Sequence, residues 1–97
     1  MKKAVIYVRG HKEKMQEIFC RLYASDKGYK ITYVTNNIDD VNLCDILLVA
    51  NPSRISRDKF RYYEILDNLK AKGIKVESVS SQDNVEETLW LTNELMK

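Results

Sequence analysis

The chain has 97 residues and a formal net charge of +2, a length that accommodates one domain, and we expect a single domain over residues 1–97. A hydrophobic fraction of 44% and a single proline exclude a disordered chain, and no apolar run approaches the length of a membrane-spanning helix. The 16 basic and 14 acidic residues are spread along the sequence, so net charge alone does not indicate nucleic-acid binding. Any anion site would have to be formed locally by the fold.

The two cysteines and the single histidine give no sign of a metal centre. Cys20 and Cys44 form no CxxC motif, and we expect them to be reduced, partly buried thiols of a cytoplasmic protein. Asp39, Asp40 and Asp45 could suggest a hard cation, but a turn and a strand entrance explain them more simply. We therefore expect no metal, no other cofactor and no membrane contact.

Strand and helix patterns alternate along the chain. Apolar runs predict four strands, at residues 3–8, 29–34, 46–50 and 74–79. Helical spacing predicts helices at residues 12–27, from a cap at Ser56 to Lys72, and from Asp83 onward. The polar segment 35–43 has room for little more than one helical turn.

The apolar residues of each helix predict the face that it buries. The first helix is expected to bury its large apolar side chains, namely Met15, Ile18, Phe19, Leu22 and Tyr23. The second is expected to bury Phe60, Tyr63, Leu66 and Leu69. Tyr62 would then be the most exposed of the aromatic residues. The last helix carries more apolar surface than one sheet face needs, which makes self-association or a partner contact a second interpretation beside simple burial; its apolar residues are Trp90, Leu91, Leu95 and Met96.

This alternation is typical of a three-layer α/β fold with a parallel, flavodoxin-like sheet. The first and third strands are the most apolar, so we place them side by side in the middle, which gives the order 2-1-3-4. Ligands of such sheets bind at the carboxyl ends of the strands, where the strand order reverses. Here that point lies between the loop Arg9–Gly10–His11 and residues 51–57.

Three arginines are brought to this point by the predicted topology. Arg54 and Arg57 follow the third strand, where the next helix is expected to begin, and Arg9 follows the first strand. Guanidinium groups bind the oxygens of a phosphate with paired hydrogen bonds, and the positive end of a helix adds to the attraction. The sequence therefore predicts a phosphate site, with surface arginines in salt bridges as the alternative.

Two blocks of the sequence resemble the catalytic domain of serine recombinases, the resolvase and invertase family. Residues 4–9, AVIYVR, are similar to the start of this family's catalytic domain, which characteristically contains the motif Y-x-R-V-S or Y-x-R-S-S. Residues 45–57 resemble its D-x-L/I/V-L/I/V-V-x-x-x-D-R-L/I/F-S/G-R segment, and residues 66–78 resemble the run after it. The resemblance covers residues 3–82 and implies a resolvase-like sheet, in a domain that cuts DNA by serine attack on a phosphate.

The match is incomplete at the site itself. Tyr7, Arg9, Arg54 and Arg57 agree with the family pattern. His11 stands at the position of the nucleophilic serine, and the other departures are Ser53 for the aspartate and Met15 for the glutamine. The resemblance also implies a long dimerisation helix and a separate DNA-binding domain, and we expect residues 1–97 to form the catalytic-type domain without either.

Arginines stabilise the charge that an attack creates but cannot replace the attacking group. The sequence therefore predicts a catalytically inactive, resolvase-like binding or oligomerisation domain. Its partners would be the phosphate backbone of DNA, a second copy or an intact recombinase. The alternatives are a flavodoxin-like domain that binds a nucleotide or another phosphorylated ligand, and an enzyme that uses His11 or a cleft serine as the nucleophile of phosphoryl transfer.

Overall fold

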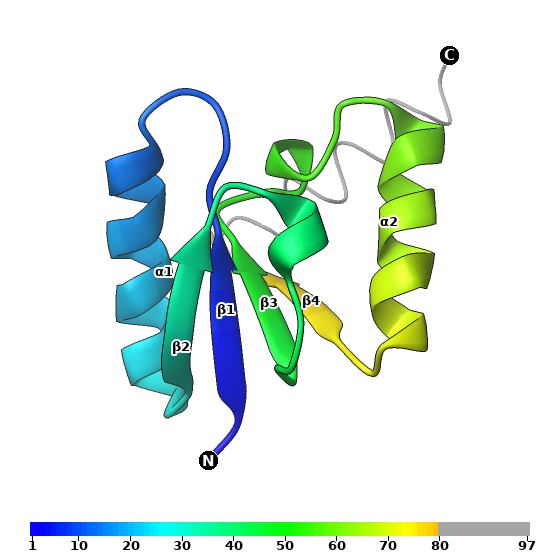
Figure 1. The fold of residues 1–97 in the computed structure, drawn as a ribbon. Helices are drawn as coiled ribbons and strands as arrows, with labels where there is room; N and C mark the ends of the chain where they lie inside the picture. The colour runs from blue at the N-terminus through cyan, green and yellow to red at the C-terminus, as the bar shows by residue number, and fades with distance from the viewer. Residues whose placement is uncertain (80–97) are drawn as a thin grey trace.

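A computed structural model describes residues 1–79, whose centre is a sheet of four parallel strands in the order β2-β1-β3-β4 (Figure 1). The strands are β1 (Lys3–Tyr7), β2 (Lys30–Thr35), β3 (Ile46–Val49) and β4 (Lys75–Ser78). The predicted α/β class and the 2-1-3-4 order are therefore confirmed. The helix expected from Asp83 onward lies outside the described residues.

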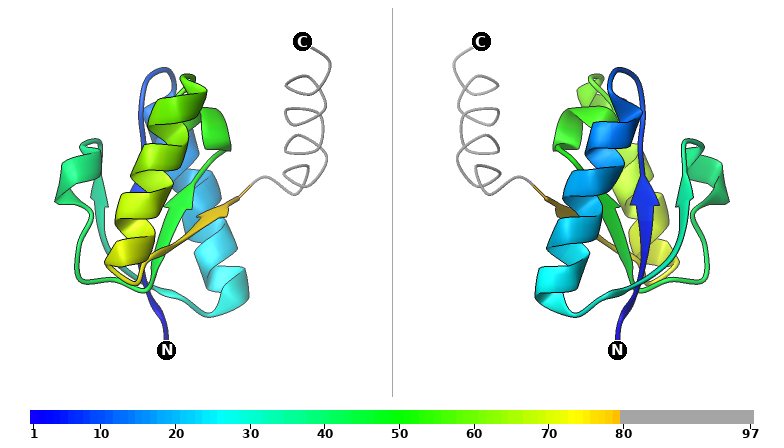
Figure 2. Two further views of the ribbon diagram at one scale, coloured as in Figure 1. Left: turned by 90° about the vertical axis from the view of Figure 1, so that its right-hand side faces the viewer. Right: turned by 90° about the vertical axis from the view of Figure 1, so that its left-hand side faces the viewer.

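Two helices cover opposite faces of the sheet (Figures 1 and 2). α1 (Glu13–Lys27) joins β1 to β2, and α2 (Lys59–Ala71) joins β3 to β4. Between β2 and β3 the chain makes one 3-10 turn, η1 (Ile38–Asp40), as expected for so short a polar segment. No helix within residues 1–79 is long and apolar enough to cross a membrane.

The two central strands are buried on both faces, as their apolar sequences predict. Val5 and Leu47 face α2, whereas Ile6 and Leu48 face α1, and all four are fully buried. Because β1 and β3 pair directly and run in the same direction, their carboxyl ends lie next to each other. The loops that follow these two strands therefore meet at one end of the sheet.

α1 contacts the sheet with a face of smaller side chains. Its buried positions are Gln16, Cys20 and Ala24, each four residues apart. The predicted burial of the large apolar residues is therefore wrong for four of the five, which are exposed: Met15, Ile18, Phe19 and Leu22. The apolar spacing gave the period of the helix correctly, but the residues that allow close approach to the sheet, rather than the most apolar ones, face inward.

α2 begins two residues later than a cap at Ser56 would allow. Asp58 is the N-cap, and its carboxylate accepts hydrogen bonds from the backbone N–H groups of Phe60 and Arg61. Ser56 instead accepts a hydrogen bond from the Asp58 backbone N–H, at 3.0 Å, and so fixes the turn before the helix. The prediction of Ser56 as the cap is therefore wrong.

The buried face of α2 also differs from the predicted one. The buried residues are Tyr62, Ile65 and Leu69, whose spacing of three and four follows the true helical period. Phe60 is 86% exposed and Tyr63 is also exposed, because a strict spacing of three drifts around the helix. Tyr62 was expected to be the most exposed aromatic residue, and that prediction is wrong.

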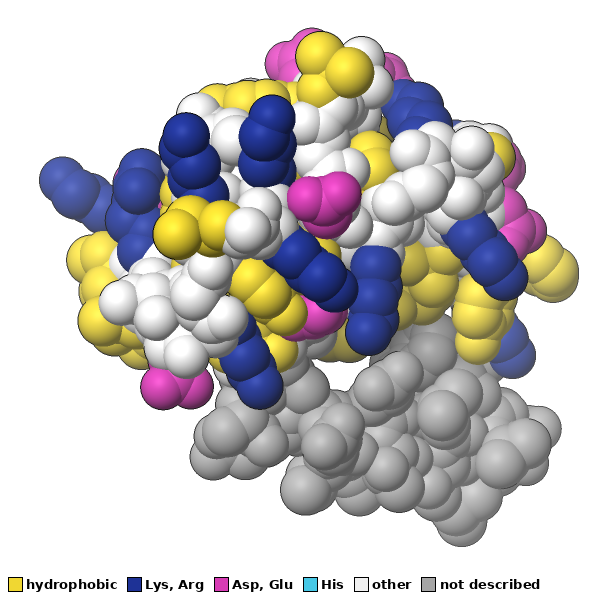
Figure 3. All heavy atoms as spheres, turned by 90° about the horizontal axis from the view of Figure 1, so that it is seen from below, with side chains coloured by type: hydrophobic (Ala, Val, Ile, Leu, Met, Phe, Trp, Pro, Cys, Tyr) yellow, Lys and Arg dark blue, Asp and Glu magenta, His cyan; other side chains and the backbone are white. Residues whose placement is uncertain are grey.

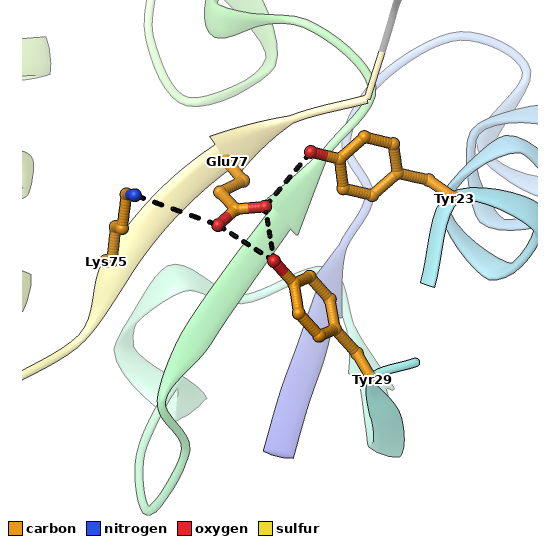
Figure 4. Close-up of polar contacts among 4 residues, drawn as sticks. All are labelled: Tyr23, Tyr29, Lys75 and Glu77. Atoms are coloured by element: carbon orange, nitrogen blue, oxygen red, sulfur yellow. Dashed lines mark hydrogen bonds and ion pairs between the residues drawn. The ribbon is translucent and has the colours of Figure 1, made fainter. Parts of the chain in front are cut away.

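A carboxylate near the end of β4 links three elements of the fold (Figure 4). Glu77 accepts a hydrogen bond from the hydroxyl of Tyr23 in α1, at 3.0 Å, and others from the hydroxyl of Tyr29, the residue before β2, at 3.0 and 3.1 Å. Lys75 lies 4.0 Å away. Partial burial raises the pKa of Tyr29, and the hydrogen bond and the negative charge of Glu77 raise it further.

The end of the sheet where the strands begin is basic, as Figure 3 shows from below. Lys3 and Lys30 are neighbours in the pairing of β1 with β2, and Lys75 begins β4. The side chains of all three are exposed. We call this surface the lysine end; it lies opposite the end where the loops after β1 and β3 meet.

Candidate phosphate-binding site

The loops that follow β1 and β3 enclose a cavity of about 480 Å³ at the carboxyl end of the sheet. The first loop supplies Arg9 and Gly10, and the second runs from residue 50 to the cap of α2. Among residues 1–79 the lining consists of Arg9, Gly10, Ser53, Arg54, Ser56, Arg57 and Asp58. We call this cavity the arginine pocket, and it lies at the reversal of strand order where α/β sheets bind ligands.

Two of the arginines also join the loops to each other. Arg9 donates from Nη1 to the carbonyl oxygen of Ile55, at 3.1 Å, and Arg54 donates from Nη1 to the carbonyl oxygen of Arg9, at 3.3 Å. Each loop therefore receives a side chain from the other. These two hydrogen bonds fix the distance between the two loops that form the pocket. They also hold both guanidinium groups in position.

Gly10 allows Arg54 to approach the first loop. Its φ angle is +81°, a backbone conformation that residues with a side chain rarely adopt. A Cβ added there would lie 3.3 Å from Nη1 of Arg54. Lys12, which precedes α1, also has a positive φ angle of 58°. The chain thus turns sharply between β1 and α1, and the turn leaves space for the guanidinium group.

Gln16 holds the first loop in place, and the sequence did not single it out. Its amide oxygen accepts a hydrogen bond from the Arg9 N–H, at 3.1 Å, and its amide nitrogen donates to the carbonyl oxygens of Arg9 and His11, at 2.9 and 2.8 Å. Gln16 is buried, whereas Met15, at the position of the family's glutamine, is exposed. The one sequence signal that could have identified Gln16 as buried is its position four residues before Cys20 and eight before Ala24, on the same face of the helix.

The second loop holds its residues with local hydrogen bonds. Pro52–Arg54 forms a 3-10 turn, η2, and the hydroxyl of Ser53 donates to the side-chain oxygen of Asn51. The buried side chain of Ile55 anchors the loop in the core. Because α2 begins at Lys59, Arg57 precedes the helix rather than lying in its first turn, where a cap at Ser56 would have placed it. Arg54 precedes the helix, as expected.

The pocket holds more positive than negative charge. Arg57 is an exposed residue of the lining, and Asp58, the one carboxylate that residues 1–79 contribute to it, already accepts hydrogen bonds from the first turn of α2. Nε of Arg54 is buried and has no hydrogen-bond partner within residues 1–79. An anion oxygen is the group that guanidinium donors in such a pocket would bind best.

Two residues of the predicted site do not line the pocket. His11 lies in the exposed turn before α1, and its backbone, not its ring, is held by Gln16. Tyr7 is buried on the α2 face of the sheet, in the same core cluster as Ile55. No group of three or more potential metal ligands lies close together in the part of the chain that the structure describes.

Comparisons of structure identify the fold. The catalytic domain of ISC1926 TnpA, an IS607-like serine recombinase, superposes with a TM-score of 0.69 at 21% sequence identity, over 96% of this chain and 82% of that chain. The N-terminal catalytic domain of TP901-1 integrase superposes with a TM-score of 0.65 at 20% identity, over 98% of this chain and 96% of that chain. The chain has the serine recombinase catalytic-domain fold. No family model matches the sequence, and no curated protein gives a significant match.

The recombinase fold explains why the arginine pocket lies at this end of the molecule. The pocket is formed entirely by the two loops that the 2-1-3-4 strand order brings together. At 20–21% identity the likeness concerns the fold, and the chemistry of this chain has to be argued from its own residues. Those residues provide guanidinium groups around a cavity, and the single histidine lies outside the cavity's lining.

Proposed function

We propose that this domain binds the phosphate backbone of DNA in the arginine pocket without cutting it, as an inactive, resolvase-like binding or oligomerisation module. The observation that carries the proposal is the convergence of Arg9, Arg54 and Arg57 on one cavity at the switch point of a recombinase fold. Guanidinium groups fit phosphate oxygens, and their attraction does not depend on base sequence. A DNA backbone would therefore be bound through charge and geometry rather than through base contacts.

The absence of cutting follows from the groups around the pocket. His11 stands where the resemblance expects the attacking serine, and its turn is exposed outside the lining. The two serines of the pocket have structural partners, since Ser53 donates to Asn51 and Ser56 accepts from the backbone of Asp58. The Asp58 carboxylate, which also lines the pocket, accepts hydrogen bonds from the Phe60 and Arg61 N–H groups, and within residues 1–79 no hydrogen bond joins it to the hydroxyl of either serine to activate it as a nucleophile.

A module of this kind acts through partners. The proposed partners are a second copy of the chain or an intact recombinase that supplies the attacking serine. The proposed compartment is the cytoplasm, in keeping with the absence of a disulfide at Cys20 and Cys44 within residues 1–79.

Fluorescence anisotropy with a labelled duplex tests the pocket against the rest of the basic surface. We expect weak binding whose affinity falls with salt, and Arg57→Ala should reduce the slope of log K against log salt by about 0.9 if one phosphate contact is lost. Lys30→Ala removes the same charge from the lysine end and is the matched control. Equal losses from both variants, or a larger loss from Lys30→Ala, would contradict binding in the pocket.

A cleavage assay tests the absence of chemistry. The purified protein should leave supercoiled DNA intact and form no covalent protein–DNA species that survives denaturation. Nicking, or a covalent species formed through any residue, would overturn the proposal. His11→Ser serves as the companion variant, and we expect no covalent species from it either, because residue 11 lies outside the pocket lining.

The size of the pocket also suits a second candidate function, the binding of a nucleotide or another phosphorylated ligand. A cavity of about 480 Å³ falls within the range of small-molecule sites, although its loops contain no glycine-rich phosphate-binding motif. Thermal shifts measured with nucleotides and with short duplex DNA separate the two ligands. Stabilisation by a nucleotide alone would favour a flavodoxin-like binding domain over the DNA module.

A further inference from the structure

α1 carries a row of large apolar side chains on the side that faces away from the sheet. The row consists of Met15, Ile18, Phe19 and Leu22, and we call it the outer stripe. These side chains are 46%, 44%, 50% and 64% exposed, respectively. Single exposed apolar residues are ordinary, but a contiguous row of four along one helix is the pattern of a surface that is covered in use.

The stripe results from the way α1 packs. The helix presents Gln16, Cys20 and Ala24 to the sheet, which turns the positions between them outward. Spacings of three, one and three place the four stripe residues on one face, since a helix turns once in about 3.6 residues. In the right-hand view of Figure 2, α1 lies in front of the sheet, and no other described element covers it.

We propose that the outer stripe is a self-association surface, in which α1 pairs antiparallel with α1 of a second copy of this chain. With a two-fold axis near Phe19, Ile18 and Leu22 interdigitate with the partner's Leu22 and Ile18. Phe19 then meets the partner's Phe19 on one flank. A two-fold pairing requires such a self-complementary surface, and the stripe provides it between residues 15 and 22 of α1.

The charges beside the stripe select a second copy in the antiparallel orientation. The register that pairs Phe19 with itself also brings Lys12, at the start of α1, opposite the partner's Asp26, near its end. Both side chains are exposed, and the two-fold axis makes the contact twice. A parallel pair would instead place Lys12 beside Lys12 and Asp26 beside Asp26, which is repulsive.

The other flank of the stripe does not oppose this pairing. Arg21 approaches the partner's Arg21 there, but each arginine already binds Glu17 of its own helix, at 2.8 Å. The antiparallel arrangement also places each helix start beside the negative end of its partner, which is electrostatically favourable. Within the helix, the charged residues are therefore distributed as the proposed pair requires.

The size of α1 sets the expected strength. A helix of 15 residues is about 22 Å long, and one helix pair buries less than the roughly 800 Å² per partner of a standard interface. The dimer should therefore be weak, forming over the micromolar range. The stripe is separate from the arginine pocket, so this proposal can fail while DNA binding stands, and the reverse also holds.

Sedimentation equilibrium of the full chain at increasing concentration tests the pairing. We expect the dimer fraction to rise with concentration, and Leu22→Glu to weaken dimerisation at least tenfold, because it places a carboxylate against the partner's Ile18. A chain that is monomeric at all concentrations would overturn the proposal. Loss of folding stability in the Leu22→Glu monomer would show that the chain's own residues cover the stripe, which overturns it as well.

A charge exchange tests the orientation independently of folding. Lys12→Glu and Asp26→Lys should each weaken the dimer at low salt, since each places like charges opposite one another. The double variant exchanges the two signs and should restore dimerisation to about the original level. A double variant weaker than either single one would contradict the antiparallel pairing.

Discussion

Replacing Glu77 with alanine should lower the free energy of unfolding by about 2 kcal/mol, because the hydroxyls of Tyr23 and Tyr29 lose their charged acceptor. The Glu77 side chain is only 16% exposed, so water replaces these hydrogen bonds poorly. The measurement is denaturant unfolding followed by circular dichroism. Glu77→Gln keeps an acceptor oxygen and should cost less than the alanine variant.

Lys75→Ala is the matched control for this cluster. Lys75 lies 4.0 Å from Glu77, but its side chain is 76% exposed, and exposed ion pairs contribute about 0–1 kcal/mol. The lysine variant should therefore stay close to the wild type. A Lys75→Ala loss as large as that of Glu77→Ala would show that the ion pair, rather than the tyrosine hydrogen bonds, stabilises this edge of the sheet.

Alkaline pH should destabilise the folded state through the same cluster. The pKa of Tyr29 is raised above its ordinary value near 10 by partial burial and by Glu77, and burial together with Asp45 raises the pKa of Cys44. The folded state holds these protons after the unfolded chain has lost them, so the stability is present below about pH 9 and falls above it. Glu77→Ala should flatten this fall, and unfolding curves between pH 8 and pH 11 measure it. An unchanged slope in the variant would contradict the role of Glu77.

The sheet was predictable because its signal is local. Five-residue apolar runs at 4–8 and 46–50 can be satisfied only by burial on both faces, and that requirement fixes the two central strands. The single turn between β2 and β3, and the ends of the helices at Gly28 and Gly73, also follow from short-range chemistry. The strand order then brings Arg9 and Arg54 together without further information.

The inward faces of the helices were not predictable from apolar content alone. In α1, the residue types that allow close packing compete with larger apolar residues for the sheet, and the smaller face of Cys20 and Ala24 wins. In α2, the predicted face repeated strictly every three residues and so drifts around the helix by about 60° per step, whereas the buried residues are spaced by three and four. A hydrophobic period defines a helix but leaves its rotation undetermined when two faces are plausible.

Side-chain contacts between residues far apart in the sequence were also not predicted. Glu77 meets tyrosines 48 and 54 positions earlier in the chain, and Arg54 meets the carbonyl of Arg9 across 45 positions. Such contacts depend on side-chain direction after folding, which periodicity does not report. The family pattern likewise drew attention to position 15, whereas the glutamine that binds the loop is the next residue.

Replacing Gln16 with leucine should lower the free energy of unfolding by about 2–4 kcal/mol, because three hydrogen bonds to the Arg9–His11 loop are lost from a buried position. Leucine has a similar volume, so the loss reports the polar contacts rather than a cavity. DNA binding in the arginine pocket should weaken as well, since Arg9 and Gly10 form one of its walls. Chemical denaturation gives the first quantity, and anisotropy gives the second.

Two further variants separate hydrogen bonding from helix effects. Glu17→Ala changes the neighbouring residue, which binds Arg21 on the surface, and should alter stability by less than about 1 kcal/mol. Gln16→Glu keeps an acceptor for the Arg9 N–H but turns a carboxylate oxygen toward two carbonyl oxygens, so it should be at least as harmful as leucine at neutral pH. Because protonation restores one donor, the glutamate variant should recover stability relative to the leucine variant as the pH falls. Equal stability of the two at every pH would show that the loop does not depend on a donor at position 16.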